Sequence, residues 1–154
     1  MATIRPNELA SYLKKRVNDS QKKTFESWQD KAMQLLKDEV SSYLDEGKSP
    51  VGGEGNFQAY SESYKKQIRG NLGKKYGKTE RPVNLKLSGK MRKQMKARKV
   101  AGGIAFWIAS KIAKYHNGEG RVDRKIYPTV EGEKFARPIR EKLAKLYVKL
   151  FRIK

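Results

Sequence analysis

Hydrophobic residues in the first third of the chain recur at intervals of three and four, the spacing of one face of an α-helix. The pattern runs through residues 7–46, with Pro6 as a start signal and Gly47 as a stop signal. A polar run at 18–23 interrupts it, so we expect a bend or two consecutive helices there. The hydrophobic positions are Leu9, Leu13, Val17, Phe25, Trp28, Ala32, Leu35, Leu36, Val40, Tyr43 and Leu44.

The period of the hydrophobic pattern changes to two at Val83, which predicts β-structure. Residues 83–87 alternate as one strand. Residues 94–100 and 103–109 predict a β-hairpin joined through Ala101-Gly102-Gly103. The segment 103–109 is apolar on both faces, so we expect it to be a central strand.

Shorter elements are predicted around these strands. Residues 59–68 read as a short helix, residues 110–116 as a helical turn, and residues 125–130 as an extended piece at a sheet edge or a strand end. A C-terminal amphipathic helix is expected from about Gly132, with Pro138 in its first turns. Its apolar positions are Phe135, Ile139, Leu143, Leu146, Tyr147 and Leu150.

The order of these elements predicts an α+β fold in a single domain, 1–154. We expect a long helical region at 1–46 and a mobile glycine-rich loop at 47–57. A core at 58–131 is expected to contain an antiparallel sheet of three to four strands with the hairpin. The C-terminal helix is expected to occupy 132–154.

Charge is the most unusual property of the sequence. The chain has 36 basic and 16 acidic residues, a formal net charge of +20. Residues 1–50 are nearly neutral, whereas residues 51–100 hold 14 basic and 3 acidic residues. Such a charge is tolerated where a polyanion or an acidic protein lies close by.

The densest positive run is 86–99, which contains seven cations and neither an acidic nor an aromatic residue. Proteins that bind single strands interleave aromatic residues for base stacking, so stacking is not expected here. Contact with phosphates and a solvated or partner-facing surface both remain open, and sequence-specific reading is not expected. The candidate cations are Lys86, Lys90, Arg92, Lys93, Lys96, Arg98 and Lys99.

Candidate catalytic chemistry is sparse. There is no cysteine, and no acidic pair has metal-ligand spacing. The only histidine, His116, is expected to be structural or exposed. The glycine-rich 51–55 lacks the Gly-Lys-Ser/Thr ending of a P-loop. We therefore expect no catalytic residue, metal or cofactor, and we expect Trp28 and Trp107 to be core residues.

Membrane and secretion signals are also missing from the pattern. No apolar run reaches the roughly 20 residues that cross a bilayer. The first residues contain no apolar core of the signal-peptide kind. We therefore expect a soluble, intracellular product with no membrane partner.

Four segments in this order resemble the neck and tail-completion proteins of tailed bacteriophages: SPVGGEGNFQAYSESYKKQI (49–68), PVNLKLSGKMRKQMK (82–96), GIAFWIASKIAKYHNGEG (103–120) and RKIYPTVEGEKF (124–135). The likeness covers roughly 48–135. It departs from the family's pattern at Lys90, where an acidic or neutral residue is expected.

The resemblance implies a structural virion protein, assembled in the host cytoplasm and located at the head–tail junction. It implies a homo-oligomeric ring, six- or twelve-fold, around the packaged double-stranded DNA and between portal or adaptor proteins and tail proteins. An inter-subunit contact is expected at the loop residues Pro50, Val51, Gly52, Gly53 and Gly55. The alternatives are a non-specific basic nucleic-acid-binding protein and, less favoured, an enzyme.

Overall fold

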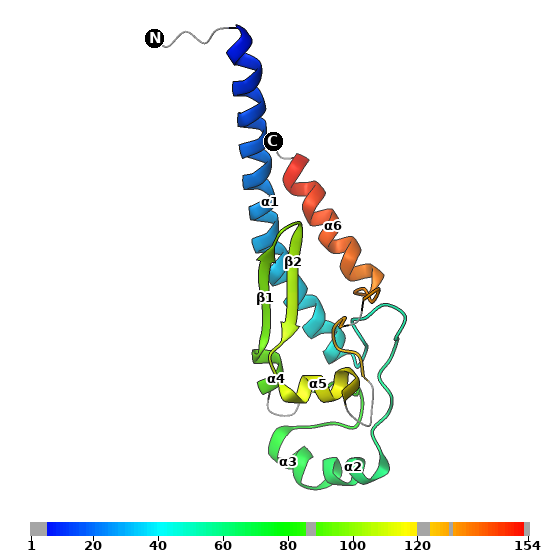
Figure 1. Ribbon diagram of the computed structural model, residues 1–154. Helices are drawn as coiled ribbons and strands as arrows, with labels where there is room; N and C mark the ends of the chain where they lie inside the picture. Colours follow the sequence, from blue (N-terminus) through cyan, green and yellow to red (C-terminus); the bar gives the residue numbers. More distant parts are fainter. Residues whose placement is uncertain (1–5, 86–88, 120–123, 130, 153–154) are drawn as a thin grey trace.

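The computed structural model describes residues 6–85, 89–119, 124–129 and 131–152, and it has an α+β fold (Figure 1). A long N-terminal helix, a two-stranded antiparallel sheet and a C-terminal helix are its main elements, and short helices lie between them. In chain order they are α1 (Pro6–Asp45), α2 (Glu62–Gln67), η1 (Ile68–Leu72), α3 (Gly73–Tyr76), α4 (Lys90–Lys93), β1 (Met95–Val100), β2 (Gly103–Ile108), α5 (Lys111–Lys114), η2 (Tyr115–Glu119) and α6 (Arg137–Arg152).

Helix α1 is one uninterrupted helix, so the expected bend or break at 18–23 is wrong. The run contains neither glycine nor proline, and polar side chains are compatible with a helix where they face solvent. Thr24, just after the run, is buried, and its hydroxyl donates to the Ser20 carbonyl oxygen at 2.9 Å. This bond lies within the helix and leaves the α-helical backbone continuous.

Helix α6 runs antiparallel to α1 and packs against it (Figure 1). The Trp28 indole lies between the two helices, donates to the Leu143 carbonyl oxygen at 3.1 Å and contacts the Tyr147 ring edge-on. An ion pair between Lys142 and Glu39, at 2.6 Å, joins the same helices. Trp28 therefore packs between the two helices, but it is half-buried and lies outside the cluster of buried core residues.

Helix α6 begins at Arg137, five residues later than predicted, and Pro138 lies in its first turn as expected. Its start is delayed because the preceding residues pair with the loop after α1. The amide of Ala136 donates to the Pro50 carbonyl oxygen at 2.8 Å, and Phe135 forms an isolated antiparallel bridge with Val51.

The predicted hairpin is present. Strands β1 and β2 pair from Met95 opposite Ile108 to Val100 opposite Gly103, and Gly102 turns the chain with a φ of 78°. A positive φ at this position is available to glycine at little cost. One face of the hairpin packs on α1, where the buried Gln29 amide donates to the carbonyl oxygens of Val100 (3.0 Å) and Gly103 (2.5 Å).

The expected third and fourth strands are not confirmed. Val83–Leu85, the described part of the 83–87 prediction, is irregular, since Leu85 has a φ of 48° that no strand adopts. Residues 86–88 lie outside the described residues. The described residues of 125–130 also form no strand, so β2 pairs with β1 alone and is not the central strand expected.

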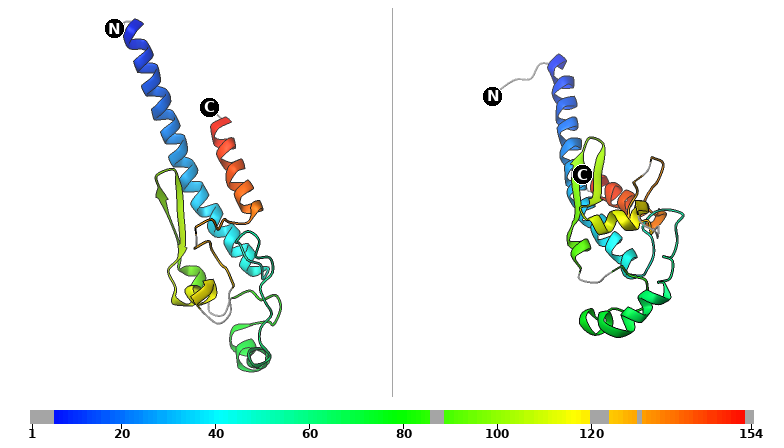
Figure 2. Two further views of the ribbon diagram at one scale, coloured as in Figure 1. Left: turned by 45° about the vertical axis from the view of Figure 1, so that its right-hand side comes forward. Right: turned by 60° about the horizontal axis from the view of Figure 1, so that its bottom comes forward.

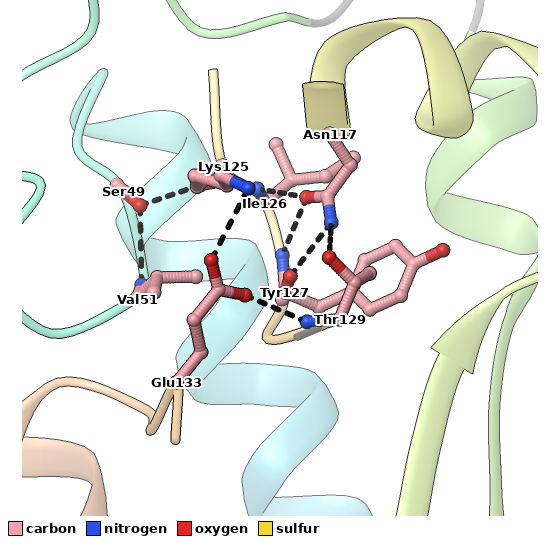
Figure 3. Close-up of polar contacts among 8 residues, drawn as sticks. All are labelled: Ser49, Val51, Asn117, Lys125, Ile126, Tyr127, Thr129 and Glu133. Carbon is pink, nitrogen blue, oxygen red and sulfur yellow. Dashed lines mark hydrogen bonds and ion pairs between the residues drawn. The ribbon is translucent and has the colours of Figure 1, made fainter. Parts of the chain in front are cut away.

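The irregular segment at 124–129 is held by polar side chains (Figure 3). Asn117 accepts from the amides of Ile126 (2.7 Å) and Tyr127 (3.1 Å) and donates to the Tyr127 carbonyl oxygen (2.8 Å) and to the Thr129 hydroxyl (3.2 Å). Ser49, from the loop after α1, donates to the Lys125 carbonyl oxygen at 2.5 Å. These bonds satisfy backbone groups that no sheet satisfies.

The hydrophobic core lies where the C-terminal half of α1 meets the hairpin, α4, α5 and the start of α6. Its most buried large side chains are Leu36, Val40, Leu44, Ile126 and Ile139. The N-terminal part of α1 extends beyond the rest of the described chain (Figures 1 and 2). Among the described helices, none combines the length and the apolar character needed to cross a bilayer.

Candidate functional site

The outer face of the hairpin carries exposed cations. Side chains alternate along β1, so Met95 faces α1 whereas Lys96 and Arg98 face solvent. Lys90 and Lys93, in the short helix α4 directly before β1, are also exposed. We call these four residues, Lys90, Lys93, Lys96 and Arg98, the basic surface. Within the part of the chain that the structure describes, none of the four has a carboxylate partner within ion-pair distance.

Two other cations of the predicted run are paired with carboxylates of α1. Arg92 lies 2.7 Å from Asp45 and donates to the Asn84 carbonyl oxygen at 3.2 Å, and only 16% of its side chain is exposed. Lys99 faces α1 and lies 2.8 Å from Asp30. Lys86 falls outside the described residues. The structure therefore assigns four of the seven candidates to an unpaired surface and two to contacts with α1.

Trp107 lies on the basic surface side of the hairpin, so its interpretation as a core residue is wrong. It is 37% exposed and is directly opposite Lys96 in the strand register. The Arg98 guanidinium lies 5.8 Å from the centroid of its ring, within cation–π range. The run 86–99 contains no aromatic residue, but the neighbouring strand supplies one in space.

The position of Trp107 beside the cations of β1 could have been predicted from the sequence through the pairing register of the hairpin. A two-residue turn at Ala101-Gly102 pairs residues whose numbers sum to a constant, which places Trp107 opposite Lys96. Residues that face each other across a β-ladder belong to one face of the sheet. The sequence signal was therefore the turn, combined with the alternation along each strand.

The loop at 47–57 has a fixed base and an exposed tip. Pro50 and Val51 are buried within the chain, and the Gly52 amide donates to the Lys134 carbonyl oxygen at 2.8 Å. Gly53 and Gly55 are exposed and have φ values of 92° and 67°. Gly52, Gly53 and Gly55 thus remain the accessible candidates for an inter-subunit contact, and the mobility of the tip stays a prediction.

His116 is partly buried beside two cations. Burial, followed by the charges of Arg124 and Lys78, lowers the pKa of its imidazole below the ordinary value. Its backbone carbonyl oxygen accepts from the Arg124 amide at 2.6 Å. No group of three or more His, Asp or Glu side chains that could hold a metal ion occurs among the described residues.

Comparison with protein-family models, with curated proteins and with solved structures finds no match to this chain.

Proposed function

We propose that this chain is a structural virion protein of a tailed bacteriophage that forms a homo-oligomeric ring at the head–tail junction. The ring, six- or twelve-fold, surrounds the packaged double-stranded DNA and contacts portal or adaptor proteins on one side and tail proteins on the other. The proposal includes no catalytic step. Its sequence basis is the resemblance of residues 48–135 to neck and tail-completion proteins.

The observation that carries the proposal is the basic surface. Lys90, Lys93, Lys96 and Arg98 are exposed and lack carboxylate partners among the described residues, so their fields add instead of cancelling. Repetition of this surface around a ring would multiply the field along the axis. Lysine and arginine attract phosphates without reading bases, which suits a protein past which DNA of any sequence travels.

The exposed apolar residues of the two long helices support self-association. Val17 on α1 is 53% exposed, and Val148 and Tyr147 on α6 are 44% and 38% exposed. Helix α1 also extends past the elements that pack on it (Figure 2). Isolated helical segments are marginally stable in water, because most helix stability in proteins comes from packing. Contact with a neighbouring subunit would supply that packing.

A second candidate function is non-specific nucleic-acid binding by a free monomer or dimer. One observation favours it: Trp107 is exposed beside Lys96 and Arg98. An exposed aromatic ring between cations is the usual arrangement for stacking single-stranded bases.

Assembly and DNA binding test the proposal together. Light scattering is measured on the protein alone and with duplex DNA, and electron microscopy is used to look for rings. We expect ring-sized oligomers that bind duplex DNA with a strong salt dependence. A protein that stays monomeric at every concentration and on DNA would contradict the ring and favour the second candidate.

A paired substitution locates the DNA contact. Lys96→Gln with Arg98→Gln should leave stability within about 0.5 kcal/mol of the wild type, because both side chains are exposed. The affinity for duplex DNA should fall, the slope of log affinity against log salt should decrease by about 2, and the loss should shrink as salt rises. The matched control is Lys145→Gln with Lys149→Gln on α6, which changes the net charge equally. Equal losses in both variants would show that total charge, and not this surface, binds DNA.

A further inference from the structure

A cavity of about 570 Å³ is lined by residues of α2, α4 and α5, by residues 58–61 before α2, and by Lys78, Leu85 and Arg124. Its size falls in the range of small-molecule sites, roughly 300–1,000 Å³. Its wall includes the exposed side chains of Gln58, Ser61, Lys90 and Ile112, so it opens to solvent. Apart from Lys90, which also belongs to the basic surface, its lining residues have no part in the proposed function.

Four cations line this cavity: Lys90 is exposed at its opening, and the other three come from separate parts of the chain. Lys78 and Arg124 are only 7% and 8% exposed, and Arg92 reaches the cavity from α4. Lys78 Nζ and Arg124 Cζ lie 5.1 Å and 5.4 Å from the centroid of the same ring, that of Tyr60. No carboxylate is among the described residues of the lining.

The two guanidinium groups keep donors available. Arg124 donates from one terminal nitrogen to the Gln58 carbonyl oxygen at 3.2 Å, and its buried Nε has no acceptor among the described residues. The Nε of Arg92 is also buried without an acceptor among the described residues, whereas its terminal nitrogens contact Asp45 and the Asn84 carbonyl oxygen. A guanidinium has five N–H donors, and a buried donor without an acceptor costs free energy. An anion in the cavity would accept charge-assisted bonds from guanidinium N–H groups that face the cavity, and not from the two buried Nε atoms.

The electrostatics of the cavity favour an anion. Burial, and then the charges of Arg92 and Arg124, lower the pKa of Lys78 to about 8. Burial also lowers the pKa of Arg124. Both shifts show that the protonated cations are less stable here than in water. A negative charge in the cavity would reverse this cost.

Part of the remaining wall is apolar. Tyr64, Leu85, Met91 and the 55%-exposed Ile112 line the cavity together with the Tyr60 ring. Inorganic phosphate could satisfy the cations but would leave this surface in water, and a DNA duplex is too wide to enter. The wall therefore suits an apolar body attached to the anionic group.

We propose that this cavity binds a small organic anion, a carboxylate or a phosphate carried on an aromatic or aliphatic body. The anionic group lies among Lys78, Arg92 and Arg124, and the body contacts Tyr64, Met91 and Ile112. The inference is independent of ring formation, since one chain supplies every residue named.

Calorimetric titration with two probes, phenyl phosphate and benzoate, tests the site. Inorganic phosphate and phenol are the controls, because each carries only the anionic or only the aromatic part of phenyl phosphate. At about 0.15 M salt, we expect phenyl phosphate or benzoate to bind at least about tenfold more tightly than inorganic phosphate or phenol, because the cations and the apolar residues of the cavity then both contribute. Comparison of the two probes identifies the anionic group preferred. Failure of both to exceed inorganic phosphate would overturn the proposal.

Variants connect the binding to the cavity. Lys78→Met with Arg124→Met should reduce phenyl phosphate affinity by about tenfold or more, because charge-assisted bonds are lost. Ile112→Glu provides a variant that folds, since the side chain is exposed, and it places a negative charge at the cavity mouth. It should also weaken binding. The control, Lys96→Gln with Arg98→Gln, should bind as the wild type does. Equal loss in this control, or no loss with Ile112→Glu, would contradict the site.

Discussion

The basic surface and the cavity both contain several cations, but they differ in how far these side chains are exposed to water. Lys96 and Arg98 are exposed on the hairpin, where their charges cost little to maintain. Lys78 and Arg124 are less than one-tenth exposed, and burial lowers the pKa of each. Exposed charges act through a field that salt screens within about 8 Å at physiological ionic strength. Buried charges act at fixed positions through oriented hydrogen bonds.

This difference predicts two kinds of recognition. The basic surface should respond to charge density, so any polyanion competes for it and salt weakens it. The cavity should respond to size, shape and charge together, because its donors are held in place and its other wall is apolar. The same residue types therefore serve different functions according to their hydration.

The largest loss of stability is expected from a substitution at Asn117, whose hydrogen bonds hold the segment next to the cavity. Asn117 makes four hydrogen bonds to the segment that follows Arg124, and Asn117→Ala leaves the amides of Ile126 and Tyr127 without acceptors. We expect a loss of about 2–4 kcal/mol in the free energy of unfolding. Urea denaturation measures it.

The control is Asn71→Ala, an exposed asparagine of η1, which should change stability by less than about 0.5 kcal/mol. Under conditions where the Asn117→Ala chain is folded, we expect weaker binding of phenyl phosphate but unchanged binding of duplex DNA. A loss of DNA binding would show that the two regions are not independent.

Periodicity predicted the parts of this fold whose residues are near one another in sequence. The 3.6-residue stripe identified α1 and α6, and the Ala101-Gly102 turn identified the hairpin. Of the candidate cations, Lys90, Lys93, Lys96 and Arg98 are exposed as expected. These features follow from local spacing, which a single sequence contains.

Features that depend on tertiary contacts were not predictable in this way. The alternation at Val83 and Leu85 suggested a strand, but Leu85 has a positive φ and Val83 is buried in an irregular segment. The cavity brings together Lys78, Arg92 and Arg124, which lie in separate parts of the sequence. No periodicity links them. Lys78 and Arg124 both contact the Tyr60 ring, and Arg92 joins them only as a lining residue of the same cavity.

A smaller change in the free energy of unfolding is expected from the titration of Lys78. Burial, and then the charges of Arg92 and Arg124, lower its pKa from 10.5 to about 8 in the folded chain. His116 also lines the same cavity. Between these two values the unfolded chain binds more protons, so this lysine makes stability rise with pH. Its destabilising effect is complete below about pH 8. Lys78→Met should therefore be more stable than the wild type near neutral pH by about 1–2 kcal/mol.

This advantage should shrink as the pH rises from 8 to 10.5, when the wild-type lysine loses its proton in both states. Urea denaturation of both chains across this range measures it. Lys96→Met is the matched control, because Lys96 is exposed and no such advantage is expected. A difference between Lys78→Met and the wild type that does not change with pH would show that burial does not disfavour the charge of Lys78.

Of the substitutions at Asn117, Lys78 and Trp107, the last is expected to change stability least. The Trp107 ring is the group through which the basic surface could recognise a ligand at short range, as we propose for the cavity. This ring is 37% exposed and lies opposite Lys96, so Trp107→Ala should cost less than about 1 kcal/mol. If the surface binds only phosphates, the affinity for duplex DNA should change by less than about twofold. If the ring stacks on bases, the affinity for a thymidine oligonucleotide should fall by about tenfold, and Trp107→Phe should restore much of it. Fluorescence anisotropy with both DNAs at one salt concentration separates these results. We expect the first, because the oligomer that we propose would surround duplex DNA, in which the faces of the bases are covered by their neighbours.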